Sequence, residues 1–571
     1  MTTTGLITEV DETSALTWIR RAVWALGAAM LALLCVFDLG PPLAFNDDWG
    51  FAWSVRHLNW LRPHIYPGSS ALAMPQIAWG WVVSLGHGDQ RLLRLSIVPF
   101  VLLAMWMLHR LARLAGASRM WSLVASLAPL AFPVFAADAT TFMSDAPYVA
   151  LLLAAAYTAA RWASGDRRGW IALCIAFATL AALQRQVGVL IPVAVTALLW
   201  LTPQKRASWR LSDWFGLALL WVGCVGAIVL PAVIGLAPPT QGSRIAEALA
   251  FQPAYLIFAL FFLPGMLGLA LLPFLPGLAL GLKRDAGWEV ARHWLLRLVI
   301  ADLVVYTIGV GLAPSGVAIF PGNVLTEYGF GSSVNQYSMG QKPVLFGAPV
   351  FVAIEILAFN ALLVFMKRFR DWWPGWANPA GTALLLLAVS QFLPLGLLHY
   401  IPYDRYYMPS VLLLVPLAAR SASWSWKPAL AGGMALVLVA VAGAFYAVGE
   451  QDYQAWQVAR NNAACLAYQY ASPNQVYAGY EAMATYVEVP YYDQHGVILG
   501  GVALSTNPTY FSLAGPAAPI LSVRFVPTYD PRAGYTYFSL APAKLVVAHG
   551  LNGLGLAIPV PQGAPACPAT G

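Results

Sequence analysis

The chain has 571 residues, of which 59% are hydrophobic and only 10% are Asp, Glu, Lys or Arg. An average soluble domain is about a quarter charged, so this composition excludes a soluble enzyme, a disordered chain and a nucleic-acid-binding protein. The formal net charge is +7. In a membrane protein, the positions of the positive charges predict which loops face the cytoplasm.

A helix needs about 20 mostly apolar residues to cross a membrane. Runs of this kind lie near residues 22–40, 94–114, 120–136, 144–163, 169–183, 186–202, 213–236, 255–281, 295–312, 346–366, 381–398, 408–421 and 428–447. With the N-terminus in the cytoplasm, every inner connection is short and basic, as the positive-inside rule requires. The expected fold class is therefore an all-α polytopic membrane protein with about 13 transmembrane helices.

This topology divides the chain into three parts. They are a cytoplasmic N-terminal tail, a transmembrane domain with large outer loops at 41–93 and 313–345, and an extracytoplasmic domain; their ranges are 1–21, 22–447 and 448–571. No small-residue cleavage site follows the first span, so we expect an uncleaved anchor in the cytoplasmic (inner) membrane.

The C-terminal part differs in composition, because it holds 12 of the 24 tyrosines. Its pattern predicts a helix over 451–470 and strands over 475–480, 520–526 and 544–547, which together indicate a small α/β domain in the periplasm. Cys465 and Cys567 are its only cysteines. In an oxidising compartment we expect them to form a disulfide; the alternative is two free thiols.

Polar residues gather on the predicted outer face. Asp47 and Asp48 follow the first span, Asp145 opens the fourth, Arg185 separates the fifth from the sixth, and Arg405 precedes the twelfth. Charge close to a membrane is costly and usually marks function. Acids can take a proton from an acceptor hydroxyl, and arginines suit a bound phosphate. This combination favours an enzyme that handles a lipid phosphate and a polar acceptor.

Each cluster also has a purely structural interpretation. Asp47 and Asp48 would cap a helix lying along the membrane surface, where the helix dipole favours negative charge. Asp145 would begin a helix that has Pro147 in its first turn, and Arg405 would pair with its neighbour Asp404. Asp138, by contrast, is expected to be a solvated loop residue.

These motifs resemble those of the GT-C superfamily of polytopic glycosyltransferases, in particular the protein O-mannosyltransferases and lipid A aminoarabinose transferases. The acidic pair that opens their first outer loop appears as Asp47-Asp48, followed by Ala52 and Arg56 in an Ala-x-x-x-Arg spacing. A Met-Thr-Asp-Ala-Pro-like motif appears at 143–147, and an Arg-Tyr-x-x-Pro motif at 405–409. The resemblance spans about residues 15–420, although Arg185-Gln186 replaces the Lys-Gly step of some members.

The resemblance implies a sugar donor built on polyprenyl phosphate, such as undecaprenyl or decaprenyl phosphate. It implies Asp47 as the base or acceptor-positioning acid, Asp48 as its partner or a metal ligand, and Asp145 as a further acid of the site. The acceptor, whether protein, lipid or glycan, is not specified. No cofactor is required, although a divalent metal ion is compatible with the acids.

The same resemblance assigns the donor phosphate to Arg405 and Arg185, with Arg56 as a third candidate. Tyr403 and Tyr406 would line the pocket for the sugar or the lipid. The alternative function is a transporter or flippase of a lipid-linked glycan, but such proteins often show internal repeats and mid-membrane charges. A further alternative is a membrane scaffold that binds glycans through its outer domain.

Overall fold

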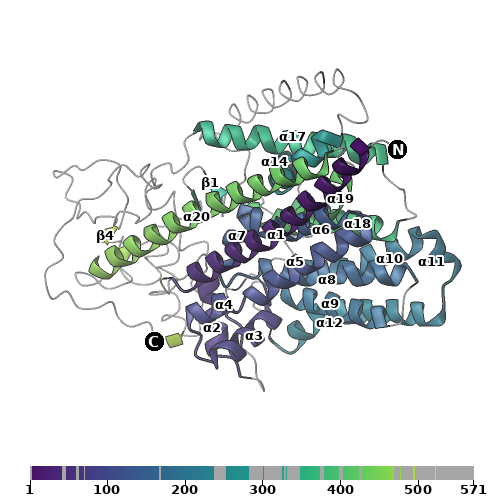
Figure 1. Ribbon diagram of the computed structural model, residues 1–571. Helices are drawn as coiled ribbons and strands as arrows, with labels where there is room; N and C mark the ends of the chain where they lie inside the picture. Colours follow the sequence, from purple (N-terminus) through teal and green to yellow (C-terminus); the bar gives the residue numbers. More distant parts are fainter. Residues whose placement is uncertain are drawn as a thin grey trace.

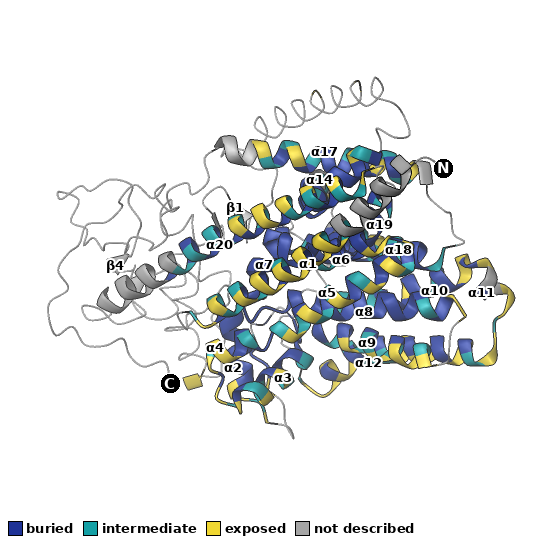
Figure 2. Ribbon diagram, viewed as in Figure 1, coloured by how far each residue is buried: buried dark blue, intermediate teal, exposed yellow. Residues whose placement is uncertain are grey.

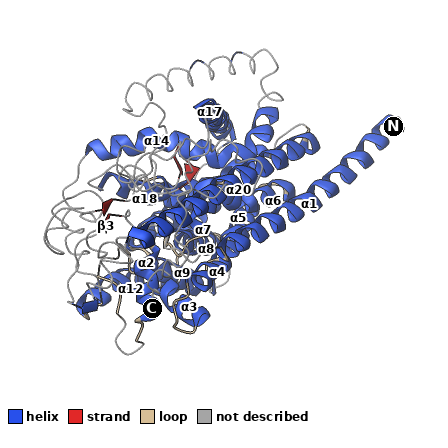
Figure 3. Ribbon diagram, turned by 90° about the vertical axis from the view of Figure 1, so that its left-hand side faces the viewer, coloured by secondary structure: helices blue, strands red, loops and turns tan. Residues whose placement is uncertain are grey.

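The computed structural model describes most of the membrane part of the chain. The described residues are 3–40, 47–59, 64–67, 69, 71–165, 169–236, 253–281, 293, 300, 325–326, 329–330, 348–372, 378–397, 403–423, 427–467, 476–477, 493–494 and 521–522. Their secondary structure is almost entirely helical, as the sequence predicts (Figure 3).

The helices follow one another with short connections. In the N-terminal half they are α1 (Thr3–Asp38), α2 (Asp48–Arg56), α3 (Met74–Ser84), α4 (Gln90–Leu95), α5 (Val98–Ala115), α6 (Arg119–Ala131), α7 (Pro133–Ala139), α8 (Asp145–Ala163), α9 (Gly169–Gln184), η1 (Gln186–Leu190), α10 (Ile191–Leu201), α11 (Pro203–Ala207) and α12 (Leu211–Val233). In the C-terminal half they are α14 (Pro253–Leu271), η2 (Leu272–Phe274), α17 (Ala348–Trp372), α18 (Pro379–Phe392), η4 (Leu393–Leu397), η5 (Asp404–Tyr407), α19 (Met408–Ala422) and α20 (Pro428–Ala467).

The apolar runs of the sequence coincide with helices wherever the structure describes them. Of the described helices, 5 are long and apolar enough to cross a membrane, or up to 6 if the bent pair α6–α7 is one span. A helical multi-pass membrane protein is thereby confirmed, whereas the larger number of spans stays a prediction. The run at 295–312 lies outside the described residues apart from residue 300. The first helix begins at Thr3, so the predicted tail is largely helical.

Beyond the last span, α20 continues without a break to Ala467, so the helix predicted over 451–470 is an extension of that span. Two predicted strands pair in parallel as β3 (Val476–Tyr477) and β4 (Leu521–Ser522). Another short pair, β1 (Leu325–Thr326) with β2 (Gly329–Phe330), is antiparallel. The strand predicted at 544–547 and Cys567 lie outside the described residues, so the α/β domain and the disulfide stay predictions.

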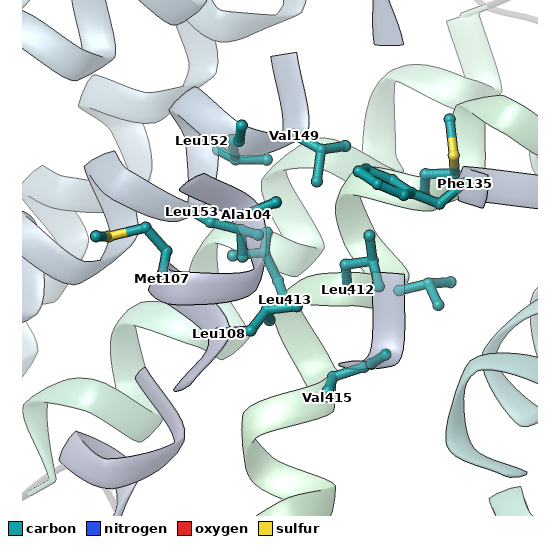
Figure 4. Close-up of a cluster of buried hydrophobic side chains, with 14 of the residues drawn as sticks. Ala104, Met107, Leu108, Phe135, Val149, Leu152, Leu153, Leu412, Leu413 and Val415 are labelled. Carbon is teal, nitrogen blue, oxygen red and sulfur yellow. The ribbon is translucent and has the colours of Figure 1, made fainter. Parts of the chain in front are cut away.

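The centre of the bundle is formed by α5, α7, α8 and α19. Their side chains interdigitate in a buried apolar cluster that includes Leu108, Phe135, Leu152 and Leu412 (Figure 4). Helix α8 is buried along almost its whole length, whereas α1 and α12 keep an exposed apolar face (Figure 2). Such faces suit contact with lipid, because a bilayer solvates apolar side chains.

A sharp bend separates α6 from α7, and it shapes the site described below. The two helix axes differ by 63°. Pro133 begins α7, and the preceding Phe132 has extended backbone angles, since a proline disfavours the helical conformation of the residue before it. The bend directs α7 against η5, with which it packs.

Helices α2, α3 and α4 lie together at one end of the bundle, opposite the N-terminus (Figure 1). Asp48 to Val55 of α2 are all buried. The helix predicted after the acidic pair therefore exists, but it is packed inside the protein on all sides rather than lying along a membrane surface. Asp47 occupies its N-cap position without a side-chain cap hydrogen bond, so capping does not account for this residue.

Candidate functional site

The first outer loop and the last motif, far apart in the sequence, meet in space. Arg405 lies on η5, directly before α19, and its Nη2 atom is 3.3 Å from Oδ2 of Asp47. The arginine side chain is only 5% exposed, while the aspartate side chain is 26% exposed. Asp47 is thus the more accessible member of this ion pair, and a substrate can reach its carboxylate.

A second ion pair joins α8 to the end of α9. Asp145 is the first residue of α8, and its carboxylate is paired with the guanidinium of Arg185. The aspartate is 1% exposed and the arginine 16%. Arg185 has an extended backbone between α9 and η1, which confirms the turn that the sequence predicts at this position.

The ring of Tyr406 joins the two ion pairs into one site. The guanidinium carbon of Arg405 lies 5.4 Å from the centre of this ring, and that of Arg185 lies 5.3 Å from it. Tyr403 contributes a second ring, 5.9 Å from Arg405. Cations within about 6 Å of an aromatic ring are attracted to its π-electrons. The structure therefore brings together four charged residues and two tyrosines that the sequence assigned to the site.

Asp138 also belongs to this site, contrary to the expectation of a solvated loop residue. It is buried on α7 and interacts electrostatically with Arg405 and Arg185. Its Oδ2 atom accepts a hydrogen bond of 3.0 Å from the N–H of Ala146, in the first turn of α8. It thereby caps the helix that carries Asp145. The bend at Pro133 places it there, and an acid inside an otherwise apolar stretch was the sequence signal.

The charge of Arg405 is strongly stabilised. Burial alone would lower its pKa, but Tyr406 and Asp47, followed by Asp138, outweigh burial and raise the pKa above its ordinary value. The pKa of Tyr403 is raised as well, mainly by burial and then by Tyr406. Arg405 consequently stays protonated at every physiological pH, so the site keeps a permanent cation for an anionic ligand.

Two predicted residues lie apart from this cluster. Arg56 is exposed in the last turn of α2 and interacts with Asp493; the length of the helix separates it from Asp47 by about 12 Å. Asp48 is fully buried in the first turn. Among the residues that the structure describes, no three His, Cys, Asp or Glu side chains are grouped to hold a metal ion, so a metal at Asp48 stays a prediction.

Residues 74–234 match the family model described as "Dolichyl-phosphate-mannose-protein mannosyltransferase". This segment contains Asp138, Asp145 and Arg185. The match confirms the resemblance to membrane glycosyltransferases of the GT-C superfamily that the motifs predict. No curated protein matches the chain at the same level.

Two solved structures are also similar. The crystal structure of ArnT from Cupriavidus metallidurans bound to undecaprenyl phosphate is 17% identical, with a TM-score of 0.37 over 79% of this chain and 81% of the other. The apo structure of that protein is 18% identical, with a TM-score of 0.36 over 79% and 80% of the two chains. At these TM-scores the similarity by itself supports no statement about fold or substrate.

Proposed function

We propose that the protein is a glycosyltransferase that moves a sugar from a polyprenyl-phosphate donor to an acceptor on the outer face of the cytoplasmic membrane. The observation that carries this proposal is the single buried site in which two arginines and three acids surround Tyr406. The family match over residues 74–234 supports a transferase of this class. The transferred group is a hexose or a pentose, and the acceptor is a protein, a lipid or a glycan.

The arginines suit the leaving group of such a reaction. When a sugar leaves polyprenyl phosphate, negative charge builds up on the phosphate oxygens, and fixed cations in a dry site stabilise that charge best. Arg405 and Arg185 approach the same ring from two ion pairs. They can therefore bind one phosphate between them, and charge-assisted hydrogen bonds from guanidinium groups are strong.

The acids divide the remaining work. Asp47 is the accessible one, so it is the group that would take the proton from the acceptor hydroxyl as the acceptor oxygen attacks the anomeric carbon. The bond from that carbon to the phosphate oxygen then breaks, with inversion at the sugar, and the lipid phosphate leaves. Asp145 and Asp138 are buried next to the arginines, where they hold the cations in place. Tyr403 and Tyr406 line the pocket.

The test is transfer of sugar from a polyprenyl-phosphate donor by the purified protein in detergent. Asp47→Asn should abolish transfer while the protein remains folded, because asparagine is as good an N-cap residue as aspartate. Asp89→Asn is the matched control: Asp89 caps α4 at the same end of the bundle and should keep the wild-type rate. Transfer by Asp47→Asn at the normal rate would show that another residue is the base. Movement of intact donor across a vesicle membrane without sugar transfer would favour the flippase instead.

A further inference from the structure

Two buried glutamines lie directly behind the ion pair of Asp145 and Arg185. Gln76 is in the first turn of α3 and Gln184 is the last residue of α9, and both are 0% exposed. The Nε2 atom of Gln184 donates to Oε1 of Gln76 at 2.7 Å and to the carbonyl of Ser144 at 3.2 Å. Its Oε1 atom accepts from the backbone N–H of Gln76 at 3.3 Å.

The network extends to the turn that precedes α8. Nε2 of Gln76 donates to the carbonyl of Phe142 at 2.7 Å, so every polar atom of the two side-chain amides has a partner. The backbone N–H of Ala73 also donates to the carbonyl of Gln184, at 3.2 Å. Helix α3 can approach this closely because it carries Gly80, where a Cβ atom would lie 2.7 Å from the ring of Phe142. Three segments are thus fastened at one point, which we call the glutamine clasp (Gln76 and Gln184).

The clasp has a direct covalent connection to the site. Two consecutive residues at the end of α9, Gln184 and Arg185, hold two consecutive residues at the start of α8, Ser144 and Asp145. No residue lies between clasp and ion pair on either strand of this contact. A shift of the clasp must therefore move the guanidinium and the carboxylate directly.

We propose that Gln76 and Gln184 are positioning residues that fix Arg185 and Asp145 in the geometry needed to bind the phosphate of the lipid donor. This proposal rests on the proposed function, because it takes Arg185 as a phosphate ligand. Hydrogen bonds between neutral amides suit this task. They are strong in a buried setting and hold fixed directions, and they place no further charge next to the arginines.

The test measures binding of undecaprenyl phosphate, and KM and kcat for the lipid-linked sugar, with the full-length protein in detergent. Gln184→Met and Gln76→Met keep the length of the side chain but remove its amide. Each leaves buried polar partners without a hydrogen bond, so Kd and KM should rise by about tenfold, with a smaller change in kcat. Gln454→Met is the matched control, since the amide of Gln454 donates to the carbonyl of Phe37 on α1 at 3.1 Å; it should leave both constants unchanged.

A purely structural role is separated from positioning by a double-mutant cycle. In an Arg185→Ala background, Gln184→Met should add no further loss of undecaprenyl phosphate binding, because its effect acts through the missing guanidinium. Additive losses, or a wild-type Kd in both glutamine variants, would overturn the positioning role even if the wild-type protein transfers sugar. If the wild-type protein binds the lipid but transfers no sugar, the proposed function fails while the cycle still decides about the clasp. If one methionine variant does not fold, the other carries the same cycle.

Discussion

Removal of the cation from the buried pair of Asp145 and Arg185 tests the electrostatic basis of the site. Arg185→Met would leave the carboxylate of Asp145, which is 1% exposed, without its salt-bridge partner. Breaking a buried pair by removing one partner costs about 3–5 kcal/mol. Since Arg185 is itself partly exposed, we expect a loss near the lower limit, about 3 kcal/mol. Asp145→Asn in the same chain removes the unpaired charge, so the double variant should regain most of this stability.

The chain offers a matched control at its other polar end. Nζ of Lys205 on α11 lies 2.7 Å from Oδ1 of Asp213 on α12, with side chains 8% and 3% exposed. Lys205→Met breaks an ion pair of similar burial, although Trp162 still donates to the same carboxylate oxygen at 2.8 Å. We therefore expect a comparable or smaller loss of stability, with sugar transfer retained. Arg185→Met, by contrast, should lose both stability and transfer.

The assay follows thermal unfolding in detergent by tryptophan fluorescence and measures sugar transfer on the same samples. The quantity of interest is the coupling between the substitutions at positions 145 and 185, obtained from the two single variants and the double variant. A coupling below about 1 kcal/mol would refute the inference that this pair is buried and mutually dependent. Equal loss of transfer in Lys205→Met and Arg185→Met would show that activity merely follows stability.

Two further substitutions address Arg405 and Asp138. Arg405→Lys keeps the charge but loses the planar group that contacts Asp47 and the tyrosine rings, so transfer should fall by roughly tenfold or more, while Arg56→Lys should be silent; equal rates in these two variants would contradict the site. Asp138→Ala removes the acceptor for the first turn of α8 and should destabilise the protein by about 1 kcal/mol, whereas Asp138→Asn keeps an acceptor oxygen. Identical melting temperatures for the alanine and asparagine variants would exclude the capping role.

The sequence predicts the helices well, because hydrophobic length is a local property that a bilayer enforces. The run at 144–163, for example, becomes α8 (Asp145–Ala163). It also predicts which charged residues share one face, because the basic inner loops fix the side of each connection. That Asp47, Asp145, Arg185 and Arg405 gather in one site follows from this topology without knowledge of any contact.

What the sequence does not predict is the choice of partners. Arg405 is paired with Asp47 rather than with its neighbour Asp404, whose carboxylate instead accepts the backbone N–H of Arg405 at 2.8 Å. This choice depends on how α7, η5 and α19 pack, which no local pattern encodes. Asp138 was missed for the same reason, since its burial follows from the bend at Pro133. Arg56 was assigned to the site by spacing alone, and the length of α2 carries it away.

The pairing of acids with arginines also explains how one site can serve two substrates in turn. The guanidinium that contacts Asp47 is the group assigned to the donor phosphate, and a hydrogen directed at the phosphate is no longer available to the carboxylate. In the proposed reaction, donor binding would therefore free an oxygen of Asp47 to accept the proton of an acceptor hydroxyl. Asp145 cannot take this part, because at 1% exposure no acceptor can reach it. The difference in exposure between the two acids thus assigns the base and makes donor binding the first step.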